Sequence, residues 1–273
     1  MIRGFLLEAA RQKREEVEFQ LGVMPLRELQ ARLRDASLPP TLGFAAAINR
    51  PGEVGLIAEV KRRSPSRGLI RKDFNLAETV RAYREAGAQA VSVLTDKKFF
   101  GGAPEFLATA RELTGQPLLR KDFIIHEYQV YESRLLGADA LLLIAELLPG
   151  GALGEFLALA RSLGLEALVE TRTAGEVERA LLAGATIIGI NNRNLHTLEV
   201  SISTTLELAG LVNKPGITLV SESGIRTRAD VEKLGACGVN AVLVGEALMS
   251  AGDLRAAVRQ FSGVAVRRAV ARA

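Results

Sequence analysis

The chain has 273 residues, of which 48% are hydrophobic, and this is enough apolar material for a large core. No apolar run approaches the length that crosses a bilayer, so we expect no membrane association. Its 35 Lys and Arg against 31 Asp and Glu leave a net charge of +4, but the chain has no recognised nucleic-acid motif, so we expect a small anionic metabolite and no nucleic acid as partner.

The sequence contains no sign of a domain boundary, because no Pro/Ser-rich or low-complexity stretch interrupts it. Since β/α barrels reach this length as one domain, residues 1–273 are expected to form a single domain. The one cysteine, Cys237, cannot form an intrachain disulfide and is expected to be a buried structural thiol in a reducing cytosol. The N-terminus lacks the apolar stretch of a secretory signal, which also favours a cytoplasmic protein. We expect a monomer, with a weak oligomer as the alternative.

Residues 1–53 precede the first strand and are expected to form a helical extension. Apolar residues recur there at helical spacing, in two groups that end before Pro39 and Pro40: Ile2, Phe5, Leu6 and Ala9, then Leu26, Leu29 and Leu33. The extension is expected either to close the floor of the fold or to pack beside its mouth. A role in covering a substrate is the alternative.

Eight short apolar runs, most of them ending in a charged or polar residue, dominate the rest of the chain. Such runs are typical of parallel strands buried on both faces. They span Val54–Val60, Ala90–Leu94, Pro117–Leu119, Ala140–Ala145, Leu165–Val169, Thr186–Ile190, Ile217–Val220 and Ala241–Val244. Helical segments such as Ala77–Ala86 and Ala174–Leu182 separate them, and glycines that can end a helix stand before several runs. The pattern predicts an α/β fold, a (β/α)8 TIM barrel, whose active site lies at the carboxyl ends of the strands.

Charged residues at three of these strand ends predict acid–base chemistry. Glu59 and Lys61 are two residues apart on one strand and therefore share a side, while Lys121 and Glu170 end two other strands. A Lys among other cations has a lowered pKa and can donate a proton, and a partly buried Glu can accept one. The alternative is that the paired charges only neutralise each other.

Polar and glycine-containing turns follow the last three strands. Asn191 ends the sixth strand, where it either orients a substrate or allows a tight turn. Ser223–Gly224 and Gly245–Glu246 follow the last two strands and precede helices, the place where barrels commonly bind phosphate through backbone N–H groups. Ordinary glycine turns are the alternative.

Several of these segments resemble the indole-3-glycerol phosphate synthase family, in order and over nearly the whole chain. They are residues 57–66, 94–102, 119–124, 189–193, 221–225 and 244–249. The resemblance implies a barrel with an N-terminal helical extension that works in tryptophan biosynthesis. It also implies the reaction: 1-(2-carboxyphenylamino)-1-deoxyribulose 5-phosphate is closed to indole-3-glycerol phosphate with loss of CO₂ and water.

The resemblance also implies roles for individual residues. Lys121 matches the general acid that protonates the ketone oxygen, and Glu170 the base of the dehydration. Lys61 matches a residue that holds the substrate carboxylate or phosphate, or that serves as a second acid. Glu59 matches a residue that orients the lysines. Asn191 matches a residue that positions the substrate and the base. Which Lys donates during dehydration stays open.

Binding residues follow by the same matches. The expected substrate-binding set is Ser64, Phe100, Phe123, Leu142, Arg193, Leu195 and Glu222, and the expected phosphate-binding set is Ser223, Gly224, Gly245 and Glu246. Many family members have Ser in place of Glu246, whose carboxylate would repel phosphate, so we expect it to turn outward. No cofactor is implied. No metal is implied either, because His126 and His196 lack ligand partners at usable spacing and Cys237 is expected on the side of its strand away from the mouth.

Two alternatives remain at this level. One is another phosphate-binding barrel, such as phosphoribosylanthranilate isomerase or the tryptophan synthase α subunit, although these would not require Glu59, Lys61, Lys121 and Glu170 together. The other is a barrel that binds a sugar phosphate without catalysis.

Overall fold

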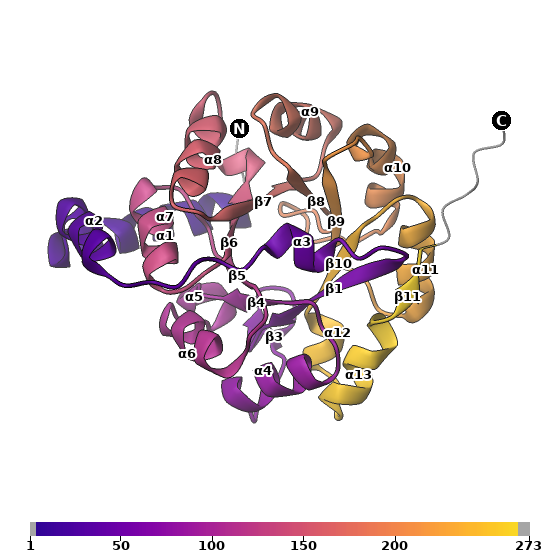
Figure 1. Ribbon diagram of the computed structural model, residues 1–273. Helices are drawn as coiled ribbons and strands as arrows, with labels where there is room; N and C mark the ends of the chain where they lie inside the picture. Colours follow the sequence, from indigo (N-terminus) through magenta and orange to yellow (C-terminus); the bar gives the residue numbers. More distant parts are fainter. Residues whose placement is uncertain (1–3, 267–273) are drawn as a thin grey trace.

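A computed structural model describes residues 4–266, so the predicted helical position of Ile2 lies outside the described residues. Its centre is a closed barrel of parallel strands, in which the last strand pairs with the first through Gly55 and Ala241. The eight strands in order round the barrel are β1 (Glu53–Val60), β4 (Ala90–Leu94), β5 (Leu118–Lys121), β6 (Ala140–Ile144), β7 (Glu166–Thr171), β8 (Ile187–Asn191), β9 (Thr218–Glu222) and β10 (Ala241–Val244). The predicted (β/α)8 barrel is confirmed (Figure 1).

A ring of helices covers the barrel from outside. One follows each strand in turn: α4 (Leu76–Glu85), α6 (Glu105–Leu113), α7 (Glu127–Leu135), α8 (Ala152–Ser162), α9 (Ala174–Leu182), α10 (Ser203–Val212), α11 (Arg228–Ala236) and α13 (Leu254–Phe261). Shorter elements lie in the loops: β2 (Arg63–Ser64), β3 (Gly68–Leu69), α5 (Lys97–Phe100), the 3₁₀ turn η1 (Ala145–Leu147), α12 (Glu246–Met249) and β11 (Val264–Ala265).

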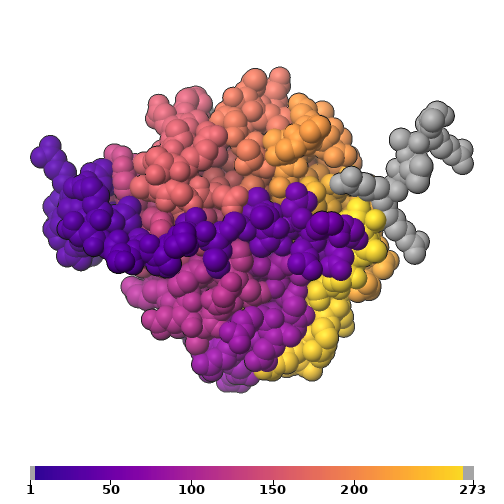
Figure 2. Space-filling model, viewed as in Figure 1, coloured from indigo at the N-terminus to yellow at the C-terminus, as the bar shows by residue number. Residues whose placement is uncertain are grey.

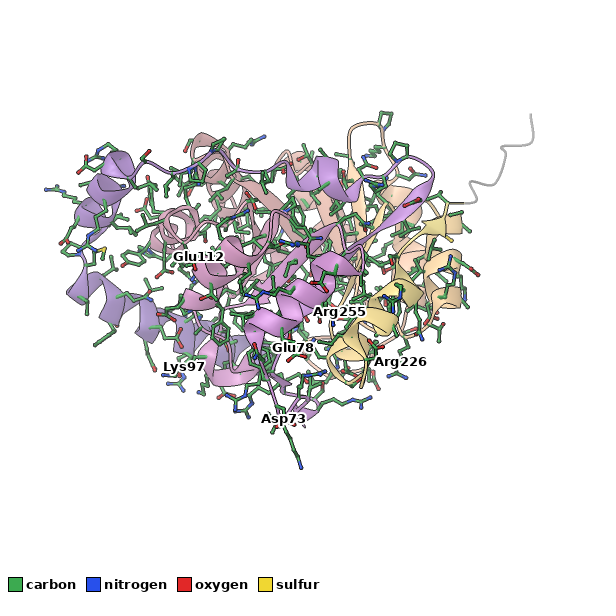
Figure 3. The ribbon with its side chains drawn as sticks, turned by 60° about the horizontal axis from the view of Figure 1, so that its bottom comes forward. Asp73, Glu78, Lys97, Glu112, Arg226 and Arg255 are labelled. Carbon is green, nitrogen blue, oxygen red and sulfur yellow. The ribbon has the colours of Figure 1, made fainter. Side chains whose placement is uncertain are left out.

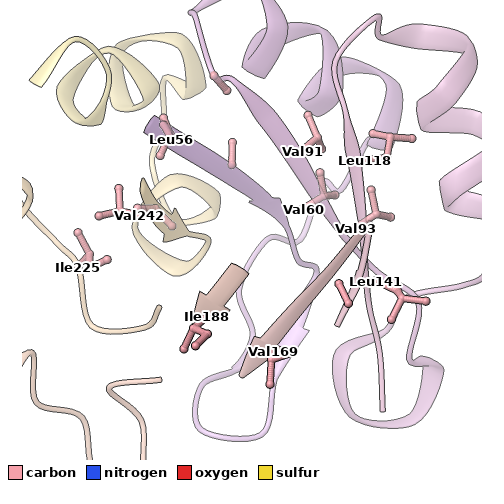
Figure 4. Close-up of a cluster of buried hydrophobic side chains, with 14 of the residues drawn as sticks. Leu56, Val60, Val91, Val93, Leu118, Leu141, Val169, Ile188, Ile225 and Val242 are labelled. Carbon is pink, nitrogen blue, oxygen red and sulfur yellow. The ribbon is translucent and has the colours of Figure 1, made fainter. Parts of the chain in front are cut away.

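Alternation along each strand separates two hydrophobic cores. On β1, Leu56 and Val60 point outward and pack under the helices, together with outward residues of the neighbouring strands (Figure 4). Ile57 points inward and belongs to the core that fills the barrel. Because side chains of a strand alternate, Glu59 follows Ile57 to the inside, near the carboxyl end of the strand. The same alternation makes polar residues near the carboxyl ends of the other strands point inward.

Four strands run past their predicted carboxyl ends. The predicted ends of β1, β4 and β10 are confirmed, and β6 ends one residue early, at Ile144. By contrast, β7 runs on to Thr171, and β5, β8 and β9 run on through Lys121, Asn191 and Glu222, which the sequence pattern placed after the strands. The strands continue because inward positions near the carboxyl ends of the barrel strands accept polar side chains. These residues are therefore held by the sheet and not by loops.

The N-terminal extension reaches both ends of the barrel. It consists of α1 (Phe5–Val23), α2 (Leu26–Asp35) and α3 (Phe44–Ile48). At α3 the backbone N–H of Phe44 donates to Glu166, the first residue of β7, so this segment lies over the amino ends of the strands. Figures 1 and 2 show it crossing the near face of the barrel, which is the floor. Since α1 packs at the opposite end, the extension both closes the floor and lies beside the mouth.

Two further predictions concern the surface. Cys237 is exposed, so the expected buried thiol is wrong: it ends α11 at the C-cap and faces solvent. No helix within residues 4–266 is long and apolar enough to cross a membrane.

Candidate active site

One cavity of about 260 Å³ opens at the carboxyl ends of the strands. Arg226 and Lys97, which follow two of these strands, lie along the lower rim in Figure 3, at the end away from the floor. Every residue that the sequence predicts for the site lines this cavity: Glu59, Lys61, Ser64, Phe100, Lys121, Phe123, Leu142, Glu170, Asn191, Arg193, Leu195, Glu222, Ser223, Gly224, Gly245 and Glu246.

Lys121 is the centre of the polar part of the cavity. Its Nζ lies 2.8 Å from Glu170 Oε2 and 2.8 Å from Glu222 Oε2. The three side chains come from β5, β7 and β9, so the closed sheet brings them together from separate parts of the chain. Asn191 of β8 donates from Nδ2 to Glu170 Oε1 at 2.9 Å, which fixes the second oxygen of that carboxylate.

The electrostatics of Lys121 differ from the prediction. Burial alone would lower its pKa, but the charges of Glu170 and Glu222 outweigh burial and hold the pKa of Lys121 above its usual value. The expected lowered pKa is therefore wrong, because the nearest charged groups are carboxylates and not cations. Burial raises the pKa of Glu222 to about 7, despite the opposing charge of Lys121. Glu222 can therefore gain or lose a proton near neutrality, beside a lysine that stays charged.

Glu59 and Lys61 form a second charged pair beside the first. Lys61 Nζ lies 2.6 Å from Glu59 Oε1, which matches the prediction that both point to one side of β1. Space for the Glu59 carboxylate comes from Gly245 of the neighbouring strand end, where a Cβ atom would overlap Glu59 Oε1. Glu59 is 4% exposed, so this pair sits inside the mouth and not on its rim.

Apolar side chains form the opposite wall. Phe100 and Phe123 pack with ring centroids 6.2 Å apart, and Leu142 and Leu195 continue the wall. Phe5 of α1 joins them, with its ring 5.9 Å from that of Phe123 in an edge-to-face arrangement. The sequence reasoning missed Phe5 as a cavity residue, since its helical spacing predicts only packing and no strand end precedes it.

One of the two turns expected to bind phosphate has an unusual backbone. Ser223 has φ 68° and Gly224 φ 76°, a left-handed region that residues other than glycine rarely adopt. Such conformations cluster at functional sites. At Gly224 a Cβ atom would also overlap the side chain of Val200. Gly245 comes directly before α12, and residues of both turns line the cavity.

Glu246 lies among arginines. Its Oε1 is 2.9 Å from Arg67 Nε, and its Oε2 is 3.7 Å from Arg193 Nη2. Arg226 also lines the cavity. Arg67 and Arg226 were not singled out from the sequence, because neither lies within the apolar run that marks a strand. The cluster makes this end of the cavity suited to an anion.

The remaining titratable candidates have other partners. His126 caps α7 by accepting from the Tyr128 N–H, and His196 pairs with Glu146. Between residues 4 and 266 no three His, Cys, Asp or Glu side chains gather in a way that could hold a metal ion.

Comparisons with known proteins address the family directly. The family profile described as indole-3-glycerol phosphate synthase matches residues 6–261. The indole-3-glycerol phosphate synthase of Carboxydothermus hydrogenoformans is 42% identical over 253 residues, which cover 91% of this chain and 96% of that protein. The one from Laribacter hongkongensis is 44% identical over 250 residues, which cover 90% of this chain and 94% of the relative.

Solved structures show the fold alone. Thiamine phosphate pyrophosphorylase from Pyrococcus furiosus superposes with a TM-score of 0.59 at 20% identity, covering 80% of this chain and 96% of its own. A mandelate oxidase variant with benzaldehyde gives 0.57 at 19% identity, covering 86% of this chain and 89% of its own. At these identities they support the barrel and say nothing of chemistry. With a profile match over nearly its whole length and relatives above 40% identity, the chain belongs to the indole-3-glycerol phosphate synthase family.

Proposed function

We propose that this chain converts 1-(2-carboxyphenylamino)-1-deoxyribulose 5-phosphate to indole-3-glycerol phosphate, CO₂ and water. The observation that carries the proposal is the Lys121 ammonium between two carboxylates, at 2.8 Å from each, inside a cavity with an apolar wall and a cationic end. A carboxy-lyase of this kind needs an acid, a base, an aromatic pocket and an anion site within one small volume.

The cavity has one place for each end of the substrate. The anthranilate ring would lie against Phe100, Phe123, Leu142 and Leu195, where an aromatic ring gains from burial and edge contacts. The phosphate would take the backbone N–H groups of Ser223–Gly224 and Gly245–Glu246, near Arg193. Lys121 and Glu170 then lie between the two ends, beside the ketone carbon, and Ser64 lines the same space.

Ring closure requires a proton on the ketone oxygen. As the ring carbon that bears the carboxylate bonds to the ketone carbon, Lys121 donates a proton to that oxygen, which becomes a hydroxyl group. The C–CO₂ bond then breaks, CO₂ leaves, and its electron pair restores the aromatic ring. Lys121 is fully charged at the start, as its raised pKa requires.

Dehydration follows with the same groups. Glu170 accepts the proton from the ring nitrogen, and a lysine donates a proton to the hydroxyl, which leaves as water. A proton then moves from the neighbouring CH₂ carbon of the ring to the nitrogen, which gives the aromatic indole. Asn191, bonded to Glu170, orients this base. Glu222, whose pKa is near 7, can return a proton to Lys121 between the two steps, and this makes it a positioning and proton-sharing residue in addition to its place in the wall.

Lys61 is the other candidate for the second acid. Its contact with Glu59 holds it near the mouth, where it can also bind the substrate carboxylate or phosphate. We further propose that residues 1–273 act as one barrel domain with residues 1–53 as its extension, and that the enzyme works as a cytoplasmic monomer.

The test is turnover. Purified protein mixed with the carboxyphenylamino-deoxyribulose phosphate should give rising indole fluorescence and one CO₂ per product. A structure with phosphate or product should place the anion at the Ser223 and Gly245 turns, with the Glu246 carboxylate directed away from it. Binding without product would support a non-catalytic sugar-phosphate protein, and an anion only at the barrel floor would contradict the phosphate site.

A further inference from the structure

A charged side chain of the extension is buried under the mouth of the barrel. Lys13 of α1 is only 4% exposed. Its Nζ lies 2.9 Å from Asp122 Oδ1, 2.6 Å from Glu16 Oε2 and 3.5 Å from Asp96 Oδ2. Asp96 follows β4 and Asp122 follows β5, so one ammonium of the extension spans two neighbouring strand ends.

Each of the two aspartates holds part of the aromatic wall. Asp96 caps α5 by accepting from the N–H groups of Phe99 and Phe100, at 2.7 and 3.3 Å. Asp122 accepts from the N–H of Phe123 at 2.8 Å. Because Asp122 also lies next to Lys121 in the chain, its placement bears on the proposed acid as well.

The two aspartates depend on Lys13 to different degrees. Asp122 has a second cation, since Arg120 Nη2 lies 3.2 Å from its Oδ2, and together the two cations outweigh burial and lower its pKa to about 2. Asp96 has Lys13 as its ion-pair partner within residues 4–266, and its Oδ2 has no hydrogen bond there. Burial raises the pKa of Asp96, partly offset by Lys13. An unpaired buried charge is costly, so removing Lys13 should disturb Asp96 most.

We propose that Lys13 is a positioning residue for the aromatic-ring pocket: its charge holds Asp96 and Asp122, and through them Phe100, Phe123 and the end of β5. The inference rests on the proposed function, because it assigns that pocket to the anthranilate ring. Phe5, on the same helix, adds an apolar contact to Phe99 with ring centroids 5.0 Å apart, so α1 supplies both a charge and a ring to the wall. The extension is in this sense part of the active site.

The experiment compares the full-length protein with Lys13→Met, which keeps most of the length of the side chain and removes the charge. Two probes report on the two ends of the cavity as inhibitors of turnover: anthranilate for the ring pocket and inorganic phosphate for the anion end. We expect kcat/KM to fall about 100-fold, the size of effect that a small misplacement of reacting groups produces. Anthranilate inhibition should weaken about tenfold or more, while inhibition by phosphate stays within about twofold.

Lys98→Met is the matched control. Lys98 also links α1 to the β4 end, through Glu8 at 3.1 Å and Gln12 at 3.2 Å, and its Nζ lies 5.1 Å from the centre of the Phe99 ring. It is on the surface, however, and forms no ion pair with Asp96 or Asp122 within residues 4–266. This variant should leave kcat/KM and both inhibition constants unchanged. A loss equal to that of Lys13→Met would show that any α1 contact matters, and would overturn the specific role of Lys13.

The possible outcomes divide clearly. If the wild-type protein does not turn over the substrate, the proposed function is refuted. If the wild type is active and Lys13→Met has the same kcat/KM, the positioning role is refuted. The positioning role is also refuted if Lys13→Met weakens inhibition by anthranilate and by phosphate to the same extent. If Lys13→Met does not fold, Lys13→Met/Asp96→Asn removes the unpaired charge and keeps the cap. Recovery of the fold, with anthranilate inhibition near that of Asp96→Asn alone, supports the proposal. Failure of the double variant to fold would show that Lys13 acts through other groups.

Discussion

The carboxylate of Glu222 occupies the space that a Cβ atom on Gly189 would take. Gly189 lies inside the barrel on β8, next to β9, which carries Glu222, and its missing side chain lets a 1%-exposed carboxylate reach Lys121. A glycine within a strand normally weakens it. Here the glycine makes room for a functional group.

Gly189→Ala should therefore impair both stability and activity. The added methyl group displaces Glu222 or the Leu168 side chain, and we expect a loss of about 1–3 kcal/mol in the free energy of unfolding. The turnover number should fall as well, because Glu222 no longer reaches Lys121. Denaturant unfolding and steady-state kinetics measure the two effects. Gly210→Ala on α10, where the methyl group meets nothing, is the control and should be neutral or stabilising; equal behaviour of the two variants would contradict the prediction.

Lys121→Ala and Glu170→Ala should each abolish most turnover and leave the fold intact. A positioned acid or base contributes ~10²–10⁴-fold to the rate. Measured kcat should fall by that factor, with a native circular dichroism spectrum. A variant with near-normal kcat would remove the residue from the proposed mechanism.

Glu222 also makes stability depend on pH. Its pKa is raised from 4.5 to about 7 in the folded protein, so the unfolded state releases the proton first as pH rises. The stabilisation from the protonated carboxyl is therefore complete below pH 4.5 and is lost as pH rises through about 7. Because glutamine stays neutral, Glu222→Gln should remove this loss of stability, which is on the order of 3 kcal/mol across the window. Unfolding curves at pH 5 and pH 8 are the measurement, and parallel pH profiles for the two proteins would contradict the assignment.

The loop that carries Lys61 should respond to ligand. Residues 61–68 include Lys61, Arg62 and Arg63, whose mutual repulsion an anionic substrate relieves. Gly68, with φ 65°, pairs with Ser64 in the short hairpin of β2 and β3. We expect less hydrogen exchange in this segment with product bound, a higher KM for Lys61→Ala, and weaker product binding at high salt. Equal exchange with and without product would indicate a preformed loop with Lys61 as a fixed ligand.

Glu246 should limit phosphate affinity. It now pairs with Arg67 and Arg193, and a phosphate at the same turns competes with its carboxylate for them. Glu246→Ser should lower the inhibition constant of inorganic phosphate several-fold, as expected when about 1 kcal/mol of repulsion is removed. Glu85→Gln is the control, because Glu85 also pairs with an arginine, Arg255, but outside the cavity. Weaker phosphate inhibition in Glu246→Ser would show that Glu246 positions the arginines instead.

The fold was readily predictable because the barrel strands are continuous apolar runs. The carboxyl ends of the strands were harder to predict. The apolar runs end before Lys121, Asn191 and Glu222, whereas the hydrogen-bonded strands include these three residues. The cavity lining followed from the strand-end rule together with the family resemblance. The pKa of Lys121 did not, since it depends on Glu222 and Glu170 approaching from strands far apart in the sequence. Phe5 and Lys13 were also beyond reach, because only tertiary packing brings α1 to the mouth.

The placement of the extension also constrains the order in which the chain can fold during its synthesis. Ribosomes deliver α1 and α3 first, yet the Phe44 N–H finds its acceptor, Glu166, 122 positions later in the sequence. The partners of Lys13 likewise emerge only with β4 and β5. Because such distant contacts form late and expose apolar surface until they do, α1 gains its partners with the third of the eight strands, and α3 gains its Glu166 acceptor only with the fifth. A nascent chain released before Glu166 should therefore leave α3 more open to proteases than α1, and completion of β7 should increase the protection of α3.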